Sequence, residues 1–173
     1  ADGFSIDTDT GQLSLGTIKD HENPDDADGD SVYELTVVAT DDVGNTATQT
    51  IAITVGDIND PPTGLVLDDI TVAQSAGIDA PVGRLSATDQ DGDALSYSMV
   101  TGDGDTDNGA FSVNGSTLQA RNASTLRAGD YSVRTEVADG NGGTDEEVFS
   151  VTAVDDVEPQ VSSVTLIDAT DGN

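Results

Sequence analysis

The sequence predicts an all-β protein of tandem Greek-key β-sandwich modules, the first of them truncated at its N-terminus. Three observations support this fold class: a composition rich in turn residues, strand-like alternation, and an internal repeat. Of the 34 acidic residues, 28 are Asp and 6 are Glu, and the chain also carries 19 Gly. Asp and Gly favour turns, whereas Glu favours helices. The composition therefore indicates short strands joined by acidic loops.

Four segments alternate apolar and polar residues with a period of two, which is the pattern of half-buried strands. They are Val32–Ala39, Thr50–Val55, Tyr131–Ala138 and Val148–Thr152. No stretch shows a convincing helical period of 3.6. Low hydrophobicity with high net charge also fits a chain that is disordered without a charge-neutralising ligand. The repeated phasing of the apolar residues favours folded strands over this alternative.

The internal repeat fixes the expected modules. An offset of 98 residues aligns Tyr33 with Tyr131, Asp41 with Asp139, Ile51 with Phe149, and Asp57 with Asp155. Upstream, Phe4 aligns with Phe111 at an offset of 107, so the first copy has nine extra residues between its Phe and its Tyr. This insertion includes Asp20-His21-Glu22 and the acidic run 25–30. A repeat near 100 residues has the size of a β-sandwich module.

The same alignment predicts the domain boundaries. We expect residues 1–57 to be the C-terminal half of a repeat and residues 58–61 to be a linker. Residues 62–157 then form a complete repeat, and residues 158–173 form a linker and the first strand of a following repeat. Half a sandwich exposes apolar faces and strand edges. Residues 1–56 are therefore expected to be poorly ordered, or completed by strands from another segment or chain.

Charge and composition exclude several classes of function. The net charge of −29 leaves no basic surface for nucleic acid or for direct contact with an anionic membrane. There is no Cys, and His21 is the only His, expected in an exposed loop. These counts remove thiol catalysis and every site that needs two histidines. Each of the six aromatic residues has a place in the expected core. None is therefore left to form a sugar-stacking platform. Small sandwiches offer few deep clefts, so we expect no enzyme activity.

Three stretches resemble the start of an EF-hand calcium loop, at residues 26–30, 89–93 and 103–107. That loop requires Gly at its sixth position and Glu at its twelfth. The sixth positions are Ser31, Ala94 and Asn108, and the twelfth positions are Val37, Val100 and Asn114. None of the three stretches is an EF-hand.

The segment Gly56-Asp57-Ile58-Asn59-Asp60-Pro61-Pro62 stands between the two copies. Together with Asp20-His21-Glu22, Ala39-Thr40-Asp41 and Ala87-Thr88-Asp89-Gln90-Asp91, it resembles the linker and flanking elements of the cadherin repeat. The second copy looks more like the dystroglycan-type cadherin-like repeats of large bacterial surface adhesins of the RTX type. Its segments 89–97 and 138–143 carry that likeness.

This resemblance implies Ca²⁺ bound between successive modules. Matched position by position, the ligands would be Asp20, Glu22, Asp57, Asn59, Asp60, Asp89, Asp91 and Asp139, with the carbonyl of Ile58. Six to eight oxygen ligands suit Ca²⁺. The sequence departs from the family in two places: the early Glu is absent from Val72–Ala76, and the exit Val154–Pro159 lacks the full linker pattern.

The resemblance implies a calcium-binding, calcium-stiffened extracellular module of a bacterial adhesin, serving in adhesion or as a rigid spacer. The expected localisation is secreted or cell-surface, with calcium ions, neighbouring repeats, other surface proteins or polysaccharide as partners. Two alternatives stay open. One is a carbohydrate-binding module of a secreted polysaccharide-degrading system, which the shortage of aromatic residues disfavours. The other is a homophilic protein-interaction module.

Overall fold

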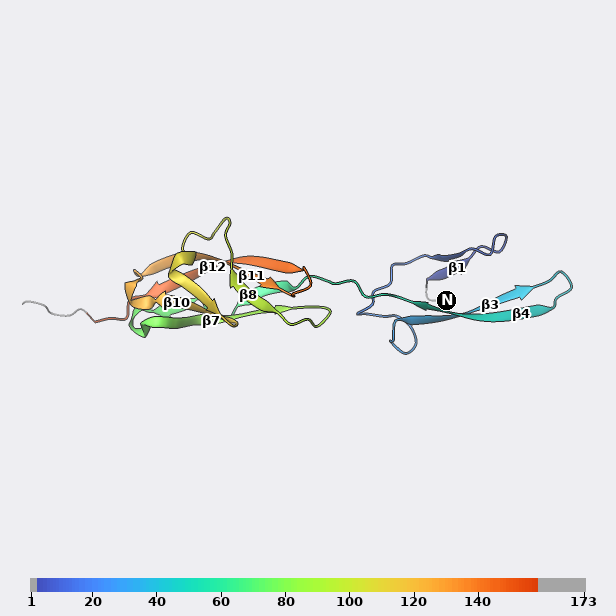
Figure 1. The fold of residues 1–173 in the computed structure, drawn as a ribbon, viewed down its shortest axis with the longest axis horizontal. Helices are drawn as coiled ribbons and strands as arrows, with labels where there is room; N and C mark the ends of the chain where they lie inside the picture. Colours follow the sequence, from blue (N-terminus) through green and yellow to red (C-terminus); the bar gives the residue numbers. More distant parts are fainter. Residues whose placement is uncertain (1–2, 159–173) are drawn as a thin grey trace, which may run out of the picture. The chain divides into compact units, whose positions relative to one another are not determined.

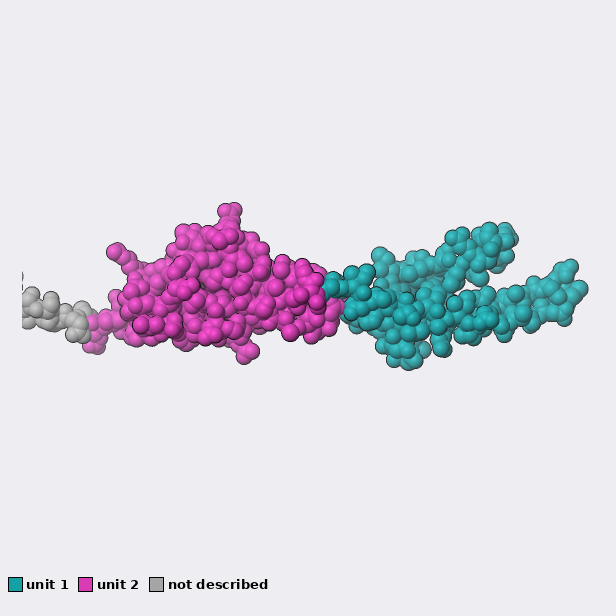
Figure 2. All heavy atoms as spheres, in the orientation of Figure 1, with its two compact units in different colours: residues 1–60 teal, residues 61–173 magenta. Residues whose placement is uncertain are grey.

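The computed structural model describes residues 3–158, and the chain divides into two compact units, residues 1–60 and 61–173 (Figure 2). Both units are built from strands, mainly antiparallel, that are joined by turns and loops (Figure 1). The predicted all-β sandwich is confirmed. The strand expected within residues 158–173 lies outside the described residues. Among the described residues, no helix has the length and apolar character needed to cross a membrane.

Unit 1 consists of two antiparallel hairpins (Figure 1). The first pairs β1 (Phe4–Ile6) with β2 (Leu13–Leu15), and the second pairs β3 (Val32–Thr40) with β4 (Thr46–Thr54). The rings of Phe4 and Tyr33 pack with centroids 5.4 Å apart. The Lys19 ammonium lies 4.7 Å from the Tyr33 centroid. These contacts join the two hairpins around Tyr33, which is only 2% exposed.

Unit 2 is a complete sandwich of two four-stranded sheets, ordered β5-β7-β10-β9 and β6-β12-β11-β8. Its strands are β5 (Thr63–Leu67), β6 (Thr71–Ala73), β7 (Ile78–Thr88), β8 (Ser96–Met99), β9 (Phe111–Asn114), β10 (Thr117–Asn122), β11 (Gly129–Ala138) and β12 (Thr144–Val154). Three short 3₁₀ turns complete it: η1 (Gln74–Ala76), η2 (Asn108–Ala110) and η3 (Ala123–Thr125).

The core of unit 2 lies between its two sheets. Phe111 and Leu118 come from one sheet, Val133 and Val151 from the other, and all four are fully buried. Successive side chains of a strand point to opposite faces. The period-two pattern of the sequence therefore supplies one apolar face to each sheet, and these two faces pack against each other.

The internal repeat is visible in the strand register. In unit 1, Val32 pairs with Thr54 and Thr40 with Thr46. The ladder of β11 and β12 has the same pairings after a shift of 98 residues: Asp130 with Thr152 and Ala138 with Thr144. The extra residues of unit 1 fall mainly between β2 and β3, where residues 16–31 replace the shorter connection 123–128 of unit 2.

Burial differs sharply between these matched strands. Val133 of β11 is fully buried, whereas Leu35, its counterpart in β3, is only half-buried. In unit 2, β11 faces the other sheet and pairs with β8 along one edge. In unit 1, Leu35 instead lines a cavity of about 420 Å³ together with Phe4, Ile6 and Leu13. The described part of unit 1 thus presents an open apolar face.

One pairing in unit 2 is parallel. Thr71, Val72 and Ala73 of β6 lie beside Thr152, Ala153 and Val154 of β12, with the two strands running in the same direction. Asp156 extends this contact by accepting a hydrogen bond from the Ser75 amide at 2.9 Å. The second strand of the unit and its last strand are therefore joined directly.

Candidate metal sites

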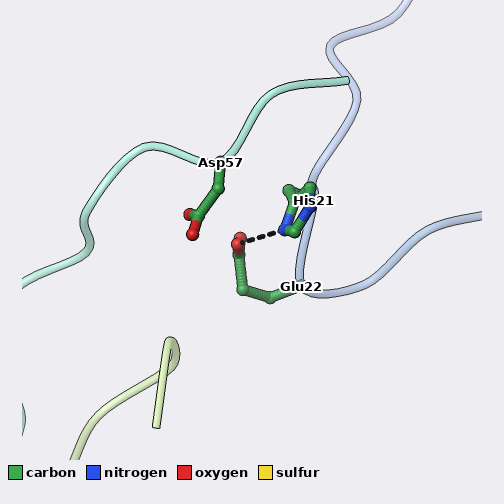
Figure 3. Close-up of side chains that lie close together, drawn as sticks. All are labelled: His21, Glu22 and Asp57. Carbon is green, nitrogen blue, oxygen red and sulfur yellow. Dashed lines mark hydrogen bonds and ion pairs between the residues drawn. The ribbon is translucent and has the colours of Figure 1, made fainter. Parts of the chain in front are cut away.

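A first acidic cluster lies in unit 1 and is called here the His21 cluster. Its members are His21, Glu22 and Asp57 (Figure 3). The first two come from the β2–β3 connection and the third from the chain just after β4. One ligand atom from each lies within 4.8 Å of the others. The Nδ1 atom of His21 is 2.9 Å from Oε1 of Glu22.

Ser31 holds together the two segments that carry the His21 cluster. Its hydroxyl donates to the His21 carbonyl at 2.9 Å, and its own carbonyl accepts from the Val55 amide at 2.9 Å. Ser31 is 3% exposed. A small, buried hydroxyl side chain therefore fixes the approach of the β2–β3 connection to the segment leaving β4.

The electrostatics of the His21 cluster favour a cation. Burial raises the pKa of Glu22, and the neighbouring carboxyl groups of Asp20 and Asp57 raise this pKa further, against hydrogen bonds that lower it. A raised carboxyl pKa shows that the negative charge is poorly accommodated. A bound cation would reverse this effect, because an opposite charge nearby favours the ionised carboxylate.

A second acidic cluster, the Asp139 cluster, lies in unit 2 and consists of Asp89, Asp93 and Asp139. Asp139 directly follows β11 and is 5% exposed. Its Oδ1 accepts hydrogen bonds from the amides of Asn141, Gly142 and Gly143, at 2.7, 3.0 and 3.0 Å. The turn between β11 and β12 thus wraps its backbone around one carboxylate.

Gly143 is required for this close packing. A Cβ atom at this position would meet the Asp139 carboxylate and would lie 2.6 Å from Cα of Pro61. Pro61 is the first residue of unit 2. The Asp139 cluster therefore lies at the end of unit 2 where the chain enters it, beside the segment that joins β4 to β5.

Asp89 gives the Asp139 cluster an unsatisfied ligand atom. Its Oδ1 accepts the Asp93 amide at 3.0 Å, whereas its Oδ2 is buried and has no hydrogen-bond partner. The side-chain amide of Asn141 donates from Nδ2 to Oδ2 of Asp93 at 2.7 Å and holds the Asp93 side chain in place. A buried carboxylate oxygen without a donor is costly. The cluster offers only oxygen ligands, which is the donor set that Ca²⁺ prefers, so these residues fit a calcium ion.

The structure brings expected calcium ligands together within each unit. Glu22 joins Asp57, and Asp89 joins Asp139. Asp20 lies beside the His21 cluster, where its Oδ1 accepts the Glu22 amide at 3.1 Å. Within unit 1, a carboxylate oxygen of Asp60 also lies within 4.8 Å of one of Glu22, although Asp60 is not a member of the His21 cluster. Ile58, Asn59 and Asp91 belong to neither of the two named clusters.

Two cluster members were not predicted from the sequence. Asp93 belongs to the Asp-x-Asp-x-Asp pattern of residues 89–93, and that alternation is the signal that could have identified it. His21 was expected in an exposed loop, but it is half-buried and contacts Glu22. Its inclusion depends on the path of the β2–β3 connection, which strand periodicity does not reveal.

Two face-to-face antiparallel sheets with acidic loops at the end where the chain enters define an immunoglobulin-like or cadherin-like repeat. The sequence profile of the family described as "Bacterial Ig domain" matches residues 59–152. The chain belongs to this family. The expected cadherin-like character is thereby confirmed at the level of the repeat.

Solved cadherin fragments share the fold. Drosophila N-cadherin EC1-4 matches with a TM-score of 0.70 and 23% identity, over 88% of this chain and 40% of that one. Human protocadherin-24 EC1-2 matches with a TM-score of 0.66 and 16% identity, over 90% of this chain and 78% of that one. Mouse cadherin-23 EC22-24 gives 0.60 and 21%, over 89% of this chain and 50% of that one. No curated protein matches the sequence.

Proposed function

We propose that this chain is a calcium-binding, calcium-stiffened extracellular module of a bacterial adhesin, serving in adhesion or as a rigid spacer. The single observation that carries this proposal is the buried, unpartnered Oδ2 of Asp89 within the Asp139 cluster. Immunoglobulin-like and cadherin-like repeats are generally structural modules without enzymatic activity. Family and fold therefore support a binding or spacing role.

Calcium suits the two clusters better than a transition metal does. The Asp139 cluster offers carboxylate oxygens from Asp89, Asp93 and Asp139. Ca²⁺ takes six to eight oxygen ligands in flexible geometry, so main-chain carbonyls and water can complete the shell. The His21 cluster offers two carboxylates, from Glu22 and Asp57, and one imidazole nitrogen, from His21. Only the two carboxylates provide the oxygen atoms that Ca²⁺ prefers. The ligand chemistry thus supports Ca²⁺ at the Asp139 cluster most strongly.

The proposed stiffening acts on the segment that joins β4 to β5. Asp57 belongs to the His21 cluster, and Pro61 packs against Gly143 beside the Asp139 cluster. Ions bound at the two clusters would restrain this segment at both ends. Without the ions, the carboxylates repel one another across short distances in a chain of net charge −29, and the segment gains freedom.

Homophilic association is a second candidate, favoured by the likeness to cadherin repeats. Sedimentation velocity in EGTA and in CaCl₂ would test it. A dimer that forms only with calcium supports homophilic contact, whereas a monomer under both conditions leaves the spacer role. None of the similarities found supports a polysaccharide partner.

Thermal unfolding tests the calcium proposal directly. Extracellular calcium modules bind with Kd of about 10⁻⁴–10⁻³ M, so about 10 mM CaCl₂ gives roughly 1.4–2.7 kcal/mol of stabilisation per ion. For a domain of about 100 residues, this corresponds to a rise in Tm of roughly 5–15 °C. The comparison is between EGTA and CaCl₂ at matched ionic strength, with MgCl₂ as the control for divalent charge.

Two variants with the same change in charge sharpen the experiment. Asp89→Asn keeps a side-chain oxygen that can accept the Asp93 amide. It removes the negative charge of Asp89, whose Oδ2 is the unpartnered atom of the Asp139 cluster. Asp79→Asn changes an exposed residue near the opposite end of β7. We expect Asp89→Asn to lose most of the calcium-dependent rise in Tm and Asp79→Asn to keep it. Equal melting of the wild-type protein in all three salts would refute calcium binding.

A further inference from the structure

The long β2–β3 connection contains a third acidic group, called here the Asp26 cluster and made of Asp26, Asp28 and Asp30. One carboxylate oxygen from each residue lies within 4.8 Å of the others. These residues belong to the insertion that distinguishes unit 1 from unit 2. They share no member with the His21 or Asp139 clusters, so this group requires a separate explanation.

Asp26 provides an independent sign of a missing ligand. Its Oδ1 accepts the Gly29 amide at 2.7 Å. Its Oδ2 has less than 1 Å² of accessible surface and no hydrogen-bond partner. An ionised carboxylate held in this way has lost water at one oxygen without gaining a donor, which costs free energy. A cation at Oδ2 would remove that cost.

The nearest basic side chain does not neutralise the Asp26 cluster. Lys19 contacts the preceding residue, Asp25, at 2.7 and 2.8 Å. Asp25 also accepts a hydrogen bond from the Tyr33 hydroxyl at 2.6 Å. None of the ion pairs among the described residues involves Asp26, Asp28 or Asp30. Three carboxylates thus face one another while the local positive charge is engaged elsewhere.

The cluster opens into a space that can hold an ion and its water ligands. A cavity of about 290 Å³ is lined by all three aspartates together with Val32, Tyr33 and Glu34. Glu34 is a fourth acidic residue that lines the same cavity. Tyr33 adds a buried aromatic ring, which gives the site a spectroscopic reporter.

We propose that the Asp26 cluster binds a hard divalent cation, Ca²⁺, with carboxylate ligands from Asp26, Asp28 and Asp30. The EF-hand pattern fails here because residues 31 and 37 are Ser and Val. That pattern is only one way to gather oxygens, and the cavity leaves room for water and for Glu34 to complete the shell. Ca²⁺ is favoured over Mg²⁺, because Mg²⁺ requires near-octahedral geometry and dehydrates reluctantly.

Terbium luminescence in the full chain tests this site. Tb³⁺ occupies calcium sites and is excited through a nearby tyrosine, and Tyr33 lines this cavity. We expect tyrosine-sensitised emission that excess CaCl₂ competes away. Tyr33→Phe should remove this emission component while the number of bound Ca²⁺ equivalents, measured by equilibrium dialysis, stays unchanged.

Charge-matched variants locate the ion. Asp26→Asn combined with Asp28→Asn should reduce the bound Ca²⁺ by about one equivalent, or weaken that equivalent by about tenfold or more. Asp28→Asn alone changes an exposed side chain and keeps the bond between Asp26 and Gly29, so it guards against loss of the loop's structure. Asp42→Asn, in the exposed β3–β4 turn, is the control and should change neither readout.

Unchanged Ca²⁺ equivalents in both Asp26-cluster variants would overturn the proposal. An equal loss in Asp42→Asn would also overturn it, because the effect would then be general charge. The result is separable from the proposed function, since Asp89→Asn tests the Asp139 cluster in unit 2. Either site can be lost while the other keeps its ion.

Discussion

At the scale of single residues, Asp139 shows how one carboxylate can organise a turn. Its counterpart in the repeat, Asp41, ends the equivalent region of unit 1 and accepts the amides of Val43 and Asn45 at 3.0 and 2.7 Å. The Asn45 side chain and backbone lower the pKa of Asp41. Asp41 is exposed, however, whereas Asp139 is buried. We therefore expect the same hydrogen-bonded turn to contribute different amounts to the unfolding free energy of the two units.

This difference predicts the cost of removing each carboxylate without calcium. Asp139→Ala removes a buried carboxylate that accepts the amides of the turn, and we expect unit 2 to lose about 2–3 kcal/mol of unfolding free energy. Asp41→Ala exposes similar amides to water and should cost about 1 kcal/mol or less in unit 1. Urea unfolding in EGTA measures both. Equal losses would show that burial does not set the strength of these turns.

Asp156 gives a pH-dependent prediction. The Ser75 hydroxyl and amide donate to this carboxylate and lower its pKa below the ordinary value of 3.8. A carboxyl group with a depressed folded pKa stabilises the protein above its unfolded pKa, and this contribution is lost as the pH falls through the folded pKa. The contact between η1 and the end of β12 should therefore weaken below about pH 3.8.

The corresponding measurement is Tm between about pH 5 and pH 2, in the wild type and in Asp156→Asn. We expect Asp156→Asn to lower Tm near pH 5 and to show a shallower fall on acidification. Asp79→Asn, an exposed residue of the same unit, is the control. Parallel curves for the wild type and Asp156→Asn would contradict the role given to the Ser75 contact.

At the scale of the strands, matched elements in the two units provide an internal comparison. Phe111 of β9 is fully buried between the sheets. Phe4 of β1 is only half-buried and packs mainly on Tyr33 and below the Lys19 ammonium. The side chains are the same and occupy matching places in their hairpins, so the difference in burial comes from the covering sheet.

Substituting each of these two phenylalanines by Ala should show how much its burial contributes to the stability of its own unit. Phe111→Ala should cost unit 2 about 3–5 kcal/mol, because it removes buried contacts and leaves a cavity. Phe4→Ala should cost unit 1 about half as much or less, since part of that ring already faces water. Hydrogen exchange at the β3–β4 and β11–β12 amides reports on each unit separately. A larger loss for Phe4→Ala would contradict the observed burial.

The strands also show how far the sequence alone could lead. Alternation located the cores of β3 and β11, and the offset of 98 residues anticipated their shared register. It missed the ends, such as Thr46–Gln49 of β4, where exposed polar residues break the alternation. The short strand β6 was also missed, because three residues carry too little periodicity and its partner β12 is distant in sequence.

The candidate sites were predicted less completely than the strands. The expected ligands Glu22, Asp57, Asp89 and Asp139 do lie in clusters, but their grouping with His21 and Asp93 depends on loop paths. The Asp26 cluster was excluded by its spacing as an EF-hand. Its gathered carboxylates and buried Oδ2 became visible only in three dimensions. Loop conformation is set by contacts such as those of Ser31, which no periodic pattern encodes.

At the scale of the whole chain, repulsion between negative charges is the main electrostatic effect on stability. A net charge of −29 repels itself throughout the folded chain. Raising NaCl from about 0.01 M to about 1 M shortens the Debye length from roughly 30 Å to 3 Å, so we expect Tm to rise without any specific ion. Thermal unfolding in a NaCl series with EGTA checks this. A Tm that falls with salt would mean that attractive ion pairs outweigh the repulsion.

The parallel pairing of β6 with β12 also determines how unit 2 bears tension. The chain enters the unit through β5, which pairs with β7, then forms β6, and it leaves after β12. Tension that reaches β6 and β12 draws these two strands past each other along their length. Their hydrogen bonds are then loaded together in shear, whereas the bonds of a hairpin pulled at its open end break one at a time. We therefore expect the parallel pairing of β6 with the last strand, β12, to resist tension along the direction in which the chain is pulled.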